Sequence, residues 1–127
     1  MTKPSPIPAR AIARAHLSQH AVPPLQWWRG DDATSYDTSA LRMALRRVSV
    51  LAYPDAYAAI AGDEVVAVRI ALHVARQADA PAWLIDWAGS LLLLSTLRGS
   101  LTAAVVLVHL RHRARATRAA AVRGRAS

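Results

Sequence analysis

The chain has 127 residues, contains no cysteine and carries a formal net charge of +8. This length suits one domain with one modest core, and the lack of cysteine excludes disulfides, Cys-based metal sites and thiol nucleophiles. Hydrophobic residues make up 54% of the chain, a fraction raised by 28 alanines, and arginine outnumbers lysine fifteen to one, as is typical of a GC-rich bacterial genome. The composition predicts a small, mainly helical protein.

The positive charge is concentrated toward the C-terminus. Residues 1–86 contain nine Lys and Arg against eight Asp and Glu, whereas residues 87–127 contain seven Arg and no acid. So uneven a charge distribution attracts polyanions, such as nucleic acid, an anionic membrane leaflet or an acidic protein surface. The charge alone does not select among these partners.

Residues 1–36 are expected to form an extended, loop-rich segment with one short helix. Three prolines lie within residues 1–8, residues 9–20 are good helix formers, and residues 21–36 contain adjacent prolines, a glycine and adjacent aspartates. Prolines and charges near the start leave no apolar run for a secretory signal, so we expect a cytoplasmic location. Two adjacent tryptophans in this segment either anchor a partner or fold back over the core.

From Asp37 onward the helix start and stop signals become regular, and residues 37–122 are expected to form a helical domain. One of Asp37, Thr38 and Ser39 can N-cap the first of these helices, and Asp63 can cap a later one. Pro54 ends or restarts a helix, and Gly62 is a C-terminal stop. The expected helices cover residues 37–52, 54–61, 63–78, 82–98 and 101–122. Residues 123–127 are expected to be a disordered basic tail.

The apolar segment 88–108 decides the architecture, because Arg98 is its only charge. The triplet of Arg98, Gly99 and Ser100 reads as a cation in a last helical turn, a left-handed stop and an N-cap. The two flanking helices would then form an αα-hairpin with a tight turn. We favour this interpretation, which gives a soluble all-α bundle of four to six helices.

The alternative is one long C-terminal transmembrane helix, since 21 nearly uncharged residues are enough to span a bilayer. Trp83 and Trp87 would lie at one interface, and the arginines after residue 110 at the cytoplasmic side of the inner membrane. Small residues recur at every fourth position, a spacing that allows close packing of membrane helices: Ser95, Gly99 and Ala103.

The Arg-rich end is the strongest candidate binding site. Arg111, Arg115 and Arg118 are spaced i, i+4 and i+7 and share one helix face. The full set of candidate contacts to nucleic acid or another polyanion is Arg111, His112, Arg113, Arg115, Arg118, Arg123 and Arg125. Because this end has no aromatic residue and no sequence-reading motif, binding should be non-specific and should weaken as salt rises. The alternatives are a solvated tail and a cytoplasmic membrane anchor.

No arrangement of residues indicates catalysis, a cofactor or a metal. Nucleophile elbows and glycine-rich phosphate loops are missing, and the spaced histidine pairs lack a third ligand. The sequence therefore predicts a non-enzymatic polyanion-binding protein. The alternatives are a single-pass membrane component of accessory, transfer or lysis type, and an interaction module completed by a partner or by a second copy. The tryptophans expected at a partner or membrane interface are Trp27, Trp28, Trp83 and Trp87.

Overall fold

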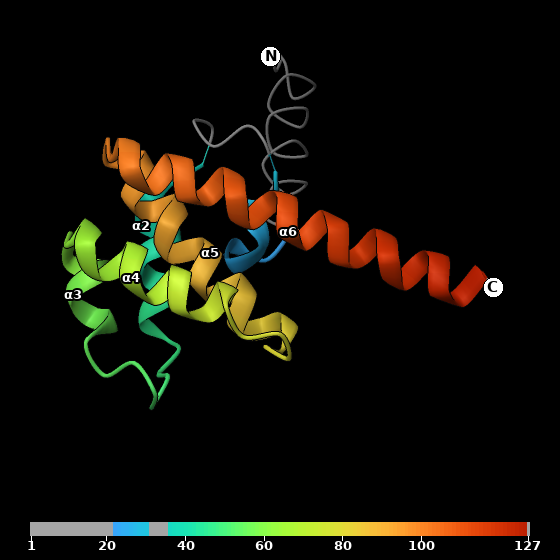
Figure 1. The fold of residues 1–127 in the computed structure, drawn as a ribbon. Helices are drawn as coiled ribbons and strands as arrows, with labels where there is room; N and C mark the ends of the chain where they lie inside the picture. The colour runs from blue at the N-terminus through green and yellow to red at the C-terminus, as the bar shows by residue number, and fades with distance from the viewer. Residues whose placement is uncertain (1–21, 31–35, 127) are drawn as a thin grey trace, which may run out of the picture.

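The computed structural model of the chain describes residues 22–30 and 36–126, and this part contains helices and no strand (Figure 1). The helices are η1 (Pro24–Arg29, a 3-10 helix), α2 (Thr38–Arg46), α3 (Ala56–Ala61), α4 (Glu64–Ala75), α5 (Ala82–Leu97) and α6 (Leu101–Ala126). These six helices confirm the predicted all-α bundle. The short helix expected at residues 9–20 lies outside the described residues.

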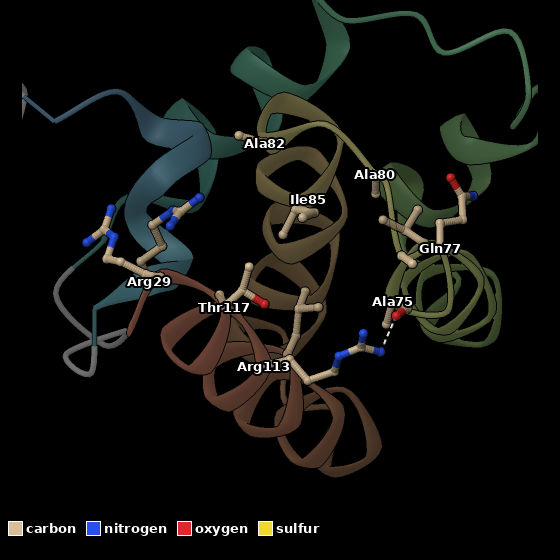
Figure 2. Close-up of a pocket in the computed structure, with 13 residues that line it drawn as sticks. Arg29, Ala75, Gln77, Ala80, Ala82, Ile85, Arg113 and Thr117 are labelled. Atoms are coloured by element: carbon tan, nitrogen blue, oxygen red, sulfur yellow. Dashed lines mark hydrogen bonds between the residues drawn. The ribbon is translucent and has the colours of Figure 1, made fainter. Parts of the chain in front are cut away.

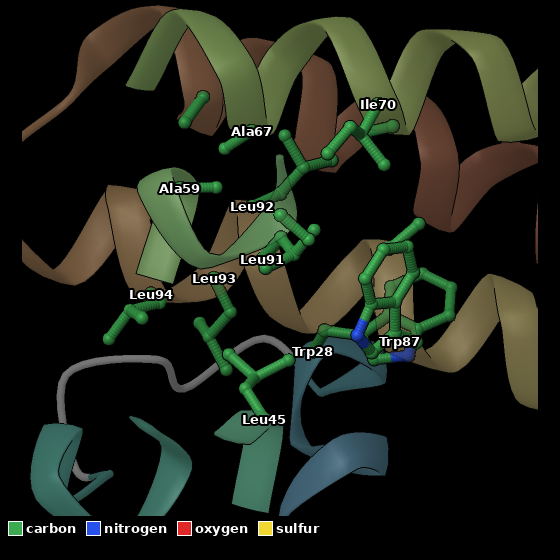
Figure 3. Close-up of a cluster of buried hydrophobic side chains, with 14 of the residues drawn as sticks. Trp28, Leu45, Ala59, Ala67, Ile70, Trp87, Leu91, Leu92, Leu93 and Leu94 are labelled. Atoms are coloured by element: carbon green, nitrogen blue, oxygen red, sulfur yellow. The ribbon is translucent and has the colours of Figure 1, made fainter. Parts of the chain in front are cut away.

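Helix α5 is the centre of the bundle, and every other described helix packs against it. Its run of four leucines, residues 91–94, is buried on all sides (Figure 3). A helix with apolar residues all round needs such cover, because each leucine removed from water contributes about 1.5–3 kcal/mol. The leucine run therefore forms the core of the bundle.

The predicted αα-hairpin between α5 and α6 is confirmed. Gly99 has a φ of +102°, the left-handed conformation that glycine adopts without a steric penalty. The side chain of Ser100 then N-caps α6, with its Oγ 3.1 Å from the backbone N of Ala103. The alternative of one continuous helix through residues 88–108 is wrong, since the chain reverses at Gly99. Among the described helices, none has both the length and the hydrophobicity needed to cross a bilayer.

Local side-chain chemistry sets the starts of α2 and α4. Asp37 Oδ1 accepts a hydrogen bond from the backbone N of Ser39 at 2.9 Å, and Asp63 Oδ1 accepts one from the backbone N of Val65 at 3.0 Å. Gly62 ends α3 with a φ of +132°. Asp37 is therefore the N-cap among the three candidates, and the predicted cap Asp63 and the predicted stop Gly62 are both present.

Helix α2 ends at Arg46, before the predicted end at residue 52. The chain leaves the helix because Tyr53 is buried, with its ring 5.6 Å from that of Trp87 between centroids. The hydroxyl of Tyr53 also hydrogen-bonds Nδ1 of His73 on α4. A helix continued through this segment would lose these contacts.

Two other helix ends also differ from the prediction. Helix α4 ends at Ala75 rather than near residue 78. Helix α6 continues to Ala126, past the expected end at residue 122 and into the segment expected to be a disordered tail. The longer α6 extends the basic end of the chain as a helix.

Candidate anion-binding site

Helix α6 carries the predicted basic residues, and its second half leaves the bundle. The inner face of its first half is buried through Leu107 and Leu110. Residues of α6 line pockets with the rest of the bundle as far as Arg118. The C-terminal end of the helix projects away from the other described helices (Figure 1). Arg115, Arg118 and Arg123 have exposed side chains along the second half of α6. The chain thus presents arginines on an extended helical arm.

Two of the predicted arginines hold the base of this arm to the bundle. Arg111 Nε donates a hydrogen bond to the backbone oxygen of Trp28. Arg113 Nη1 donates one to the backbone oxygen of Ala75, the last residue of α4. A cation at this position also interacts favourably with the α4 dipole. Arg111 and Arg113 therefore orient α6 in addition to carrying charge.

Arg29 of η1 joins this basic region, although it lies far from α6 in the sequence. Its Nε and Nη2 are each 2.7 Å from Oδ1 of Asp86, a buried residue of α5. Its guanidinium carbon lies 5.1 Å from the ring centroid of Trp28, within cation–π range. These contacts fix the guanidinium near the base of the arm.

Helix η1 is held against α5 by two small residues. The single hydroxyl proton of Ser90 can be donated to either of two backbone oxygens, because Oγ lies 2.8 Å from that of Leu25 and 2.7 Å from that of Asp86. Gly89 lies directly under the indole of Trp28, where a side chain has no room. The fully buried Trp28 then places Nε1 at 2.9 Å from Oδ1 of Asp86. The position of η1, and so of Arg29, depends on this packing.

Gly89→Ala should therefore destabilise the protein despite the better helix propensity of alanine. The added Cβ would lie within 2.6 Å of three ring atoms of Trp28. Overpacking of this kind costs about 1–3 kcal/mol, which chemical denaturation would measure. In a Trp28→Leu background the same change should cost much less. An equal cost in both backgrounds would contradict the contact.

A small pocket forms where η1 meets α6. Its volume is about 90 Å³, and its lining contains four arginines and no carboxylate. The lining residues are Trp28, Arg29, Arg111, Ala114, Arg115 and Arg118. Guanidinium groups match the paired oxygens of phosphates and carboxylates, so this arrangement can bind an anion. Arg29 is the member that the sequence analysis missed, because no local pattern connects it to α6.

The remaining predicted residues are two basic residues of α6 and the three small residues around the hairpin turn. His112 is exposed on α6, and the side chain of Arg125 is outside the described part. Ser95 and Ala103 are buried on different arms of the hairpin, and Gly99 lies in the exposed turn between them. The three small residues therefore do not form one packing stripe, because the chain bends within it.

Three of the four tryptophans expected at an interface belong to the core instead. Trp27, Trp28 and Trp87 are buried, and only Trp83, at 55% exposure, faces outward. Trp27 Nε1 donates to the backbone oxygen of Val22 at 3.0 Å, so the indole is buried with its polar atom paired. Trp27 and Trp28 therefore fold back over the core, which is one of the two alternatives that the sequence left open for this pair.

The hairpin turn adds a second concentration of positive charge. Partial burial of Arg98, followed by the nearby charge of Arg42, lowers the pKa of Arg98 from its ordinary value. Desolvation disfavours the charged form of the guanidinium, and the like charge of Arg42 adds to this effect.

Within the described residues, no three His, Asp or Glu side chains lie close enough to hold a metal ion. Comparison of the chain with family models, with curated proteins and with solved structures found no match.

Proposed function

We propose that this protein binds polyanions, and nucleic acid backbones in particular, without catalytic activity of its own. The observation that supports this most is the course of α6, which continues past the bundle while carrying exposed arginines. A helix that projects beyond the other described helices can lie along a long, charged partner. A cytoplasmic location would give it access to nucleic acid.

The charge on this arm is not compensated within its own sequence. No Asp or Glu occurs after residue 86, so every charged residue of α6 is basic. Residues 111–126 extend about 24 Å at 1.5 Å per residue, which spans several phosphates of a nucleic acid backbone. Arginine recognises phosphate oxygens irrespective of the base sequence. The expected binding is therefore non-specific and sensitive to salt.

The triple variant Arg115→Ala/Arg118→Ala/Arg123→Ala tests this proposal. Each lost phosphate contact should reduce the slope of log K against log salt by about 0.9, so the triple should lower it by up to about 2.7. Fluorescence anisotropy with a labelled random-sequence duplex, titrated at several KCl concentrations, measures the slope. The far-ultraviolet circular dichroism spectrum should remain helical.

A matched variant distinguishes binding at a defined site from attraction by the net charge of the protein. Arg46→Ala/Arg47→Ala/Arg76→Ala removes the same charge from exposed positions at the C-terminal ends of α2 and α4. We expect this variant to keep most of the affinity and nearly the full slope. Equal losses in the two triple variants, or no binding by the unmodified protein at low salt, would remove the α6 arm as a nucleic-acid site.

A further inference from the structure

A larger groove lies beside the arginine pocket, under the base of the α6 arm. Its volume is about 380 Å³, and it lies between the end of α4, the start of α5 and the middle of α6 (Figure 2). Its floor is apolar and includes Val74, Ile85 and Leu110, together with several alanines. Arg29 and Arg118 line both this groove and the smaller pocket. The groove is therefore continuous with a region of positive charge.

The charged residues that line this groove are all arginines, and one of them, Arg29, is paired with Asp86 of α5. Arg29, Arg113 and Arg118 line it, and no Asp or Glu does. Arg29 uses Nε and Nη2 on Asp86, and Arg113 uses Nη1 on the backbone of α4, which leaves each a further nitrogen. Arg118 is exposed near the point where α6 leaves the bundle. The groove thus combines an apolar floor with donors suited to an anion.

We propose that this groove binds a small amphipathic carboxylate, with its hydrocarbon body on the apolar floor and its carboxylate at Arg118 and Arg29. A volume of about 380 Å³ is at the lower end of the range for small-molecule sites. An apolar surface with a few convergent polar groups is also the usual composition of such sites. The arginines that line the groove favour an anion. The limited volume of the groove favours a small molecule over a protein segment.

Decanoate is a suitable probe, and decanol is its uncharged counterpart. We would titrate each, below its aggregation limit, into the 15N-labelled full-length protein and follow the backbone amide shifts. Decanoate should cause saturable shifts in residues 75–82 and 113–118, with an affinity at least about tenfold higher than that of decanol. Equal affinity of the two compounds, or shifts confined to other helices, would overturn the proposal.

Two variants and one control locate the site. Arg118→Gln should weaken decanoate about tenfold and leave decanol unchanged, since only the charge-assisted contact is lost. Ala78→Trp should block both compounds, because Ala78 lines the groove and is exposed. Arg76→Gln removes the same charge outside this groove and should change neither affinity. Unchanged decanoate binding by Ala78→Trp would exclude the groove.

The Ala78→Trp variant also tests whether the groove and the nucleic-acid site are separate. Ala78→Trp keeps every arginine of the chain, so its salt-dependent binding to the random duplex should equal that of the unmodified protein. Loss of decanoate binding with retained duplex binding supports the groove as a separate site. Loss of both, with the fold intact, would contradict that separation.

Discussion

Replacing Trp28 with alanine should lower the free energy of unfolding by about 3–5 kcal/mol. The indole is fully buried between η1 and α5, so its removal leaves a large cavity (Figure 3). The change also removes the Nε1 donor to Asp86, a buried carboxylate. Urea denaturation followed by far-ultraviolet circular dichroism measures the loss.

Trp83→Ala is the matched control, since it removes the same side chain from a position that is 55% exposed. Its cost should be about 1 kcal/mol or less, as is usual for surface substitutions. If the two substitutions cost the same, Trp28 does not lie in the core and η1 does not pack as described. A selective loss at Trp28 would support the placement of Arg29 beside α6 as well.

Asp86→Ala should lower the free energy of unfolding by about 2–4 kcal/mol, because two donors lose the acceptor that they share. Trp28 Nε1 and the guanidinium of Arg29 both bond to Asp86 Oδ1. The side chain of Arg29 is 33% exposed, so water recovers part of the loss and the cost should stay below that of a fully buried pair. Thermal and chemical denaturation should agree on the size of the effect.

The exposed ion pair between Asp55 and Arg69 gives the comparison for this prediction. Both side chains are largely open to water, with 44% and 56% exposure respectively. Asp55→Ala should therefore cost about 0–1 kcal/mol, the range of surface pairs. A cost for Asp86→Ala no greater than that for Asp55→Ala would contradict the role of Asp86 as the buried acceptor of η1.

The features that were predictable from the sequence depend on residues close together in the chain. Asp63 caps a helix through backbone groups two and three residues away, and Gly62 and Gly99 end helices through their own φ angles. Such signals act within one helical turn, so they can be recognised without knowledge of the fold. The bend at Gly99 was the most consequential of them.

The features that were not predictable depend on tertiary contacts. Trp28 and Asp86 are 58 residues apart, and nothing near either residue indicates the other. Arg29 belongs to the segment that was expected to be loop-rich, yet Asp86 and the Trp28 ring hold it at the base of α6. Helix α2 ended early for the same reason, since the core contacts of Tyr53 outweigh local helix propensity.

The candidate site itself was predicted in part. The face shared by Arg111, Arg115 and Arg118 follows from helical periodicity. The sequence could not indicate that Arg111 and Arg113 also hydrogen-bond the backbones of η1 and α4, because those bonds depend on how α6 crosses the bundle. The groove beneath α6 likewise exists only because the hairpin brings α5 and α6 together.

The bend at Gly99 is the feature on which the fold, the basic arm and the groove all depend, and one distance tests it. The chain contains no cysteine, so spin labels at Ala82→Cys and Thr117→Cys would be the only ones attached. Both residues are exposed and line the same groove. Double electron–electron resonance should therefore give a distance between the two labels well under half of that expected for a straight helix. One continuous helix would place the labelled residues about 52 Å apart. A distribution centred near that value would contradict the hairpin.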